Sequence, residues 1–122
     1  MNVIIADDSM VVRSIVEKAM TPLGYRLFKA AHGGEVIEIL EKVEADVGLI
    51  LMDWNMPTMD GFQALVRIKA DRRFFSIPVV MLTSESDDNK VKKAYDAGAA
   101  GYVKKPFTRE ELIENVQQVL KD

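Results

Sequence analysis

The sequence predicts an α/β protein built around a parallel sheet of five strands. Short runs rich in β-branched residues alternate with amphipathic stretches along the whole chain. Several runs are apolar throughout, which is typical of strands buried on both faces. The amphipathic stretches are long enough to be the crossover helices of consecutive βα units, which cover both faces of a sheet. Because no linker, repeat or low-complexity tract interrupts it, we expect residues 1–122 to form one domain.

Five short segments have the composition of strands. They are Val3–Ala6, Arg26–Ala30, Val47–Met52, Pro78–Leu82 and Ala100–Lys104. The first, third and fourth are almost continuously apolar, so we expect them inside the sheet. The second is followed by Ala31 and His32, which offer little chemistry, and we expect it to lie outside the functional region.

Five amphipathic segments are expected to be helices. They are residues 9–22, 34–43, 60–70, 87–97 and 108–120. In the first, apolar residues recur at spacings of three and four, as on one face of a helix, namely Val12, Ile15, Val16 and Ala19. Thr108, followed three residues later by Glu111, has the spacing of a capping box at the start of the last helix.

Composition restricts the possible functions. Hydrophobic residues make up 48% of the chain and charged residues 29%, as in a globular protein. The net charge of −3 argues against a nucleic-acid-binding protein that relies on bulk electrostatics. The absence of cysteine excludes disulfides, thiol catalysis and cysteine metal sites. Since neither a signal peptide nor a membrane-spanning run is recognisable, we expect a cytoplasmic domain without a membrane partner. We also expect the protein to be a monomer.

Polar side chains gather where the predicted strands end. In an open parallel sheet, functional residues lie at the carboxyl ends of the strands, near the point where the strand order reverses. The residues at or just after these ends are Asp7, Asp8 and Ser9; Asp53 and Asn55; Thr83, Ser84 and Glu85; and Lys104, Lys105 and Pro106. Three carboxylates, a hydroxyl and an ammonium group are therefore expected at one edge of the sheet.

This set of side chains favours a hard cation and phosphoryl chemistry. Clustered carboxylates hold protons unless a cation lies between them. Oxygen ligands without histidine or cysteine favour Mg²⁺, which suits a few carboxylates and keeps several waters. A carboxylate is a competent nucleophile toward a phosphoryl donor, and Mg²⁺ neutralises charge on the transferred group. We therefore predict that Asp53 is phosphorylated, with Thr83 and Lys105 contacting the phosphoryl oxygens.

Simpler roles are possible for each of these residues. Asp8, Ser9 and Asp53 could be helix-capping or turn residues. Spacing alone does not choose between Lys104 and Lys105, because successive strand residues point to opposite faces.

Four segments of the chain resemble the receiver domains of two-component response regulators. They are DDS at 7–9, DWNMPTMDG at 53–61, the threonine at 83, and AGAAGYVKKPFT at 97–108. The segments occur in the order of that family, and the resemblance covers essentially the whole chain. It is greatest for the single-domain members that regulate chemotaxis. It implies the strand order 2-1-3-4-5.

The resemblance also assigns roles to individual residues. It makes Asp53 the phosphoacceptor and selects Lys105 as the ligand of the phosphoryl group. Asp8 would bind Mg²⁺ directly, Asp7 chiefly through water, and Asn55 through its main-chain carbonyl. The peptide bond between Lys105 and Pro106 would be cis.

A switch and an output face follow from the same resemblance. Thr83 and Tyr102 would form the switch pair, in which the hydroxyl moves to the phosphoryl group and the ring turns inward. Partners would bind a face that includes Lys90, Val91, Lys93 and Tyr102. The family implies a stand-alone signalling protein and not an enzyme. Its expected partners are a histidine kinase, a phosphatase, and a flagellar motor switch protein or another protein target.

Three alternatives differ in testable features. A flavodoxin-like electron carrier shares the fold and would be yellow when purified, but Asp7 and Asp8 would repel the phosphate that its first loop binds. A phosphatase with an aspartate nucleophile needs a second acid two residues later, where this chain has Asn55. Within the family, a phosphorelay intermediate or another receiver with a non-motor target stays open.

Overall fold

The structure, a computed structural model, describes residues 1–42, 46–84 and 88–121. It contains one parallel sheet with the strand order β2-β1-β3-β4-β5, as predicted. The strands are β1 (Asn2–Ala6), β2 (Arg26–Ala30), β3 (Val47–Asp53), β4 (Val79–Thr83) and β5 (Gly101–Lys104). Among these residues, no helix has both the length and the apolar character needed to span a membrane.

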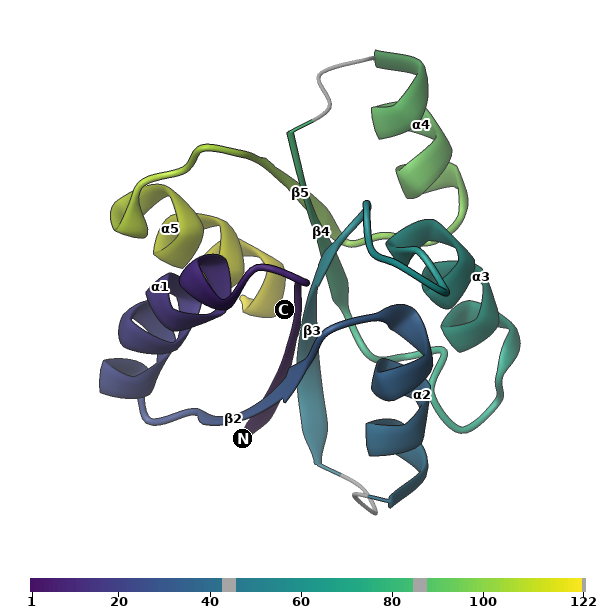
Figure 1. The fold of residues 1–122 in the computed structure, drawn as a ribbon, viewed down its shortest axis with the longest axis horizontal. Helices are drawn as coiled ribbons and strands as arrows, with labels where there is room; N and C mark the ends of the chain where they lie inside the picture. The colour runs from purple at the N-terminus through teal and green to yellow at the C-terminus, as the bar shows by residue number, and fades with distance from the viewer. Residues whose placement is uncertain (43–45, 85–87, 122) are drawn as a thin grey trace.

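Within the described residues, five α-helices connect and follow the strands. They are α1 (Met10–Met20), α2 (Gly33–Lys42), α3 (Gly61–Ala70), α4 (Asp88–Asp96) and α5 (Arg109–Leu120), with a short 3₁₀ turn at Thr21–Leu23. Helices α1 and α5 cover one face of the sheet, and α2, α3 and α4 cover the other (Figure 1). The last residue of the second predicted helix and the first of the fourth lie outside the described residues.

Both faces of the sheet are buried because side chains alternate along each strand. On β1, Val3 and Ile5 belong to the apolar cluster formed with α1 and α5. Ile4, between them in sequence, belongs to the cluster on the opposite face, with α2, α3 and α4. The sheet is therefore the middle of three layers, which confirms the interpretation of the apolar runs.

Two strands continue one residue further than their apolar runs predict. Asp53 still pairs with Leu82 in the sheet, and Thr83 pairs with Lys104. Sheet pairing uses main-chain groups, so a polar side chain does not end the strand. The functional candidates Asp53 and Thr83 are consequently fixed as the last residues of β3 and β4.

The helix termini show the expected capping. The Thr108 hydroxyl accepts from the Glu111 main chain at 3.0 Å and Glu111 accepts from the Thr108 main chain at 3.0 Å, which confirms the predicted capping box. Helix α1 ends earlier than expected and continues as a 3₁₀ turn containing Pro22. Ile15 was expected on its buried face, but the residue is 44% exposed at the edge of the apolar stripe.

Candidate functional site

Main-chain hydrogen bonds hold the candidate residues at the carboxyl edge of the sheet. The Asp7 N–H donates to the Ala30 carbonyl at 3.0 Å, directly after the end of β1. Trp54 N–H, just beyond Asp53, donates to the Leu82 carbonyl at 3.0 Å. Lys105 N–H donates to the Thr83 carbonyl at 2.7 Å. Side chains from four strand ends are thus positioned by the same parallel ladder.

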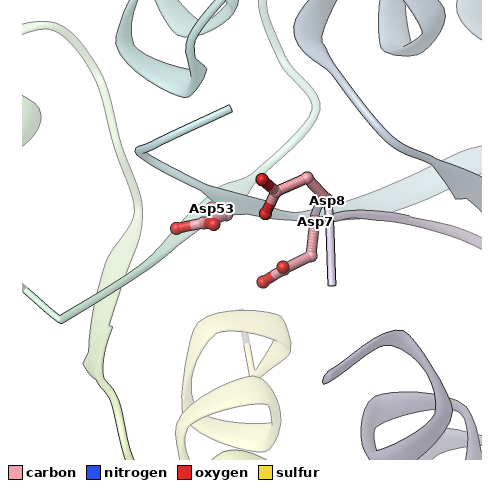
Figure 2. A group of neighbouring side chains, drawn as sticks. All are labelled: Asp7, Asp8 and Asp53. Atoms are coloured by element: carbon pink, nitrogen blue, oxygen red, sulfur yellow. The ribbon is translucent and has the colours of Figure 1, made fainter. Parts of the chain in front are cut away.

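Three carboxylates meet at this edge. One carboxylate oxygen from each of Asp7, Asp8 and Asp53 lies within 4.8 Å of the others. Figure 2 shows that they come from the adjoining ends of β1 and β3. Asp7 is fully buried and Asp53 is 5% exposed, whereas Asp8 is exposed. The cluster therefore has a buried base and one side open to solvent.

Lys105 lies between two of these acids. Its ammonium nitrogen is 2.6 Å from Asp7 Oδ2 and 3.3 Å from Asp53 Oδ2. The other Asp7 oxygen accepts from the main-chain N–H of Ser9 at 2.9 Å. The main-chain N–H of Asn55 donates to Asp53 Oδ1 at 3.4 Å. Lys105 is therefore the lysine placed in the cluster, while Lys104 is an exposed residue at the end of β5.

Burial controls the ionisation of the site. It raises the pKa of the Asp53 carboxyl above its ordinary value, and the negative charge of Asp7 raises it further. The ammonium of Lys105 opposes both effects on Asp53 but does not cancel them. Burial by itself would lower the pKa of Lys105, yet the hydrogen bond to Asp7 and the two nearby carboxylates raise it. Lys105 is thus firmly protonated, and the charge on Asp53 is costly.

The cluster is suited to a hard divalent cation. All the donors are oxygens, which favour Mg²⁺ over softer metals. When ionised, the carboxylates of Asp7, Asp8 and Asp53 carry three negative charges and Lys105 one positive charge, which leaves two negative charges. A divalent cation would balance them, and the exposed side at Asp8 would leave room for water ligands. The chemistry of the donor set therefore fits the expected metal.

Thr83 and Tyr102 occupy neighbouring strands beside the cluster. Thr83 is fully buried at the end of β4, and Tyr102 is half-buried on β5, the edge strand. In the sheet register Met81 pairs with Tyr102 and Thr83 with Lys104. The two residues therefore lie on adjacent strands, two register positions apart, and their movement as a switch pair stays a prediction.

The lysines of the expected partner face contact aromatic rings. Trp54, directly after Asp53, stacks on Phe62 of α3 with ring centroids 5.1 Å apart and an interplanar angle of 16°. The Lys90 ammonium lies 5.4 Å from the Trp54 ring centroid, and that of Lys93 lies 4.6 Å from the Phe62 centroid. These cation–π contacts connect α4 to the segment that follows Asp53. From the sequence, the two lysines were expected either on the partner face or on a solvated helix face, and their contacts with aromatic rings were not predicted.

Arg13 also contacts the site, although the sequence did not predict this contact. Its guanidinium donates to the main-chain carbonyl of Asp7 at 2.7 Å. Ser9 caps α1 by accepting from the Val12 N–H at 3.3 Å, so Arg13 begins the second turn of that helix. Its position could have predicted the contact, because Arg13 follows the N-cap Ser9 by four residues and Ser9 directly follows the paired acids.

The start of α3 is packed directly against the main chain of Asp53. The N–H of Gly61 donates to the Trp54 carbonyl at 2.8 Å. A Cβ at residue 61 would overlap the main-chain oxygen of Asp53. Glycine therefore allows the loop after β3 to close tightly, and α3 begins with the capping box formed by Asp60 and Gln63. Glu85, expected beside the site, lies outside the described residues.

Comparison with protein families matches residues 3–117 to the response regulator receiver domain. The chain belongs to the response regulator receiver family. The receiver fold accounts for the strand order and for acids at the ends of β1 and β3. The cis peptide bond between Lys105 and Pro106, which the resemblance implied, is also present.

Curated relatives of this receiver domain include chemotaxis proteins. It is 38% identical to chemotaxis protein CheY1 of Helicobacter pylori over 98% of this chain and 97% of that protein. It is 36% identical to the CheY homologue of Campylobacter jejuni, over 98% of this chain and 92% of the relative.

Solved structures include receiver domains with the same architecture. Chemotaxis protein CheY4 of Vibrio cholerae superposes with a TM-score of 0.88 at 32% identity, over 98% of both chains. The receiver domain of a sensor histidine kinase from Pseudomonas aeruginosa has a TM-score of 0.87 at 27% identity, over 99% of this chain and 98% of that one. That second structure has a magnesium ion coordinated in its active-site cleft.

Proposed function

We propose that this receiver domain accepts a phosphoryl group on Asp53 from a histidine kinase in a Mg²⁺-dependent reaction. The observation that carries the proposal is the position of Asp53 within 4.8 Å of two further acids and 3.3 Å from the Lys105 ammonium. Asp7, Asp8 and Asp53 would hold the metal together with the main-chain carbonyl of Asn55. The magnesium-bound relative from Pseudomonas aeruginosa supports this assignment.

In this reaction an Asp53 carboxylate oxygen attacks the phosphorus of the phosphohistidine. A P–O bond forms, the P–N bond breaks, and the released imidazole nitrogen keeps the electron pair and takes up a proton. Lys105 would contact one phosphoryl oxygen, and the Thr83 hydroxyl would donate to another. When bound, Mg²⁺ supplies positive charge against the phosphoryl oxygens.

The phosphoryl group would then change a protein-binding face. Its oxygens extend beyond the Asp53 carboxylate and would offer the Thr83 hydroxyl an additional acceptor, which would favour the inward position of Tyr102. The face would include Lys90, Val91, Lys93 and Tyr102. Because relatives of high coverage are chemotaxis proteins, we propose a flagellar motor switch protein as the target of a single-domain regulator.

Intact mass measurement tests the phosphoryl chemistry. The protein is incubated with a small acyl phosphate, with and without Mg²⁺, beside an Asp53→Asn variant. We expect one phosphoryl adduct on the wild type only when Mg²⁺ is present, and none on the variant. Asp96→Asn, which removes an exposed acid from α4, should still form the adduct. A folded wild type without an adduct, or an adduct on Asp53→Asn, would refute the proposal.

Charge reversal tests the partner face. A Lys90→Glu, Lys93→Glu double variant should bind a flagellar motor switch peptide more weakly than the phosphorylated wild type does. A Lys18→Glu, Lys92→Glu double variant changes two other lysines, both exposed, and alters the net charge by the same amount, so it controls for net charge. Unchanged affinity in the double variant, with phosphorylation intact, would remove these two lysines from the output face while leaving the phosphoryl chemistry in place.

A further inference from the structure

A groove lies at the surface of α3 and of the loop that precedes this helix. It has a volume of about 370 Å³ and is lined by Thr58, Met59, Phe62, Gln63, Val66 and Arg67. Val66 is 45% exposed, in contrast to Leu65 and Ile68 of the same helix, which are fully buried. The groove therefore presents apolar surface to solvent on a helix that already has a complete buried face.

Two cationic side chains, those of Arg67 and Lys93, lie near this apolar surface. Arg67 belongs to the groove itself, and its guanidinium makes no ion pair or side-chain hydrogen bond within the part of the chain that the structure describes. On the α4 side, the Lys93 ammonium lies 4.6 Å from the centroid of the Phe62 ring. None of the described lining residues is acidic. The nearby Asp60 carboxylate is engaged as the N-cap of α3.

Hydrogen bonds connect the base of the groove to neighbouring elements. The Met59 carbonyl accepts from the Gly33 N–H at 2.9 Å, which ties the loop before α3 to the start of α2. Gln63 and Asp60 close the capping box of α3. A ligand would therefore bind a preformed surface and would not have to order it, which lowers the cost of association.

We infer that this groove binds a peptide segment of a partner protein in which a large apolar side chain is flanked by carboxylates. The apolar side chain would contact Phe62 and Val66, while the carboxylates would pair with Arg67 and Lys93. An apolar centre with a charged rim, arginine included, is the usual anatomy of a protein interface. The inference goes beyond the proposed function, because neither Asp53 nor a phosphoryl group takes part in binding.

Selection from a displayed library of random 12-residue peptides tests the inference. The unphosphorylated protein, without Mg²⁺ or phosphodonor, is the target, and a Val66→Glu, Arg67→Glu double variant is used to remove unspecific peptides. We expect enriched peptides that combine a large apolar residue with neighbouring Asp or Glu. Enrichment of basic peptides, or no enrichment after the counter-selection, would overturn the inference.

A synthesised, fluorescently labelled peptide from the selection gives the quantitative readout. By fluorescence anisotropy, Val66→Glu and Arg67→Glu should each weaken binding of the peptide at least about tenfold. Added NaCl should weaken binding of the peptide to the wild type, because salt screens the charge pairs. Val11→Glu, at a 68% exposed residue of α1, is the matched control and should bind like wild type. Equal weakening by Val11→Glu would overturn the inference. Self-association of the wild-type protein that is lost in Val66→Glu would also overturn the inference, because the groove would then bind a second copy of the protein.

Discussion

Asp53 is placed where its charge is unfavourable in the metal-free protein. The residue is 5% exposed and shares the site with Asp7, and both burial and that neighbouring charge raise the pKa of its carboxyl. Lys105 offsets only part of this cost. A carboxyl group whose pKa is higher in the folded state than in the unfolded state destabilises the fold at any pH where it is ionised in both.

Asp53→Asn should therefore stabilise the metal-free protein. Near neutral pH we expect a gain in the free energy of unfolding on the order of 1 kcal/mol, because the amide removes the buried charge. The gain should shrink as the pH falls through the raised folded-state pKa and vanish below the unfolded-state value, where both states are protonated. Urea titrations in EDTA across this pH range measure it. Asp96→Asn, at an exposed residue, is the control, and an equal gain there would contradict the assigned cause.

Thr58 is a second residue with a local cost. Its φ of +66° lies in the left-handed region, which a β-branched residue rarely adopts. The side chain is exposed, so replacing it removes no buried contact. Asparagine tolerates this conformation, and Thr58→Asn should raise the free energy of unfolding by about 1 kcal/mol. In the same urea assay Thr21→Asn, at φ −56°, should give no gain; a similar gain at both positions would show that backbone strain is not the cause.

For the helices and strands, sequence patterns predicted that each element exists more accurately than where it begins and ends. All five strands and five helices were expected, since apolar runs and amphipathic spacing follow directly from burial. Asp53 and Thr83 were excluded from β3 and β4 because side-chain polarity says nothing about main-chain pairing. Ile15 was expected to be buried but is 44% exposed, because a spacing of three or four does not distinguish the centre of an apolar stripe from its edge.

The contact between α3 and α4 has an energy that can be measured. Lys93 lies over the Phe62 ring, within the range of a cation–π interaction. A double-mutant cycle with Lys93→Met and Phe62→Leu should give a coupling energy of about 0.5–1 kcal/mol in the free energy of unfolding. The methionine keeps the apolar stem and loses only the charge. A cycle with Lys92→Met, at an exposed residue of the same helix, should show no coupling, and coupling of equal size there would refute the contact.

At the scale of the whole molecule, the sequence predicted which residues meet but not how they pair. A parallel sheet brings the strand ends together, so the proximity of Asp7, Asp8 and Asp53 could be predicted from the chain alone. The shorter distance from the Lys105 ammonium to Asp7 than to Asp53 could not be predicted, because it depends on side-chain positions that sequence spacing does not specify. The stack of Trp54 on Phe62 joins two elements through side chains, and sequence periodicity carries no information about it.

The charge balance of the site links metal binding to the stability of the whole domain. Three carboxylates and one ammonium leave an excess of two negative charges, so we propose that Mg²⁺ binds the folded state preferentially. A ligand that binds only the folded state stabilises it by ~2.7 kcal/mol at about 100 times its Kd. Mg²⁺ should therefore raise the free energy of unfolding of the wild type, measured by urea titration against NaCl of equal ionic strength.

Asp8→Asn separates metal binding from folding. Asp8 is exposed, so the substitution should change the metal-free stability little, while it removes one negative donor from the cluster. Most of the stabilisation by Mg²⁺ should be lost in this variant and kept in Asp96→Asn. If Asp8→Asn gained as much from Mg²⁺ as the wild type, Asp8 would not be a metal ligand. If the wild type gained nothing from Mg²⁺, the folded domain would not bind this cation preferentially, and the proposed metal site would be refuted.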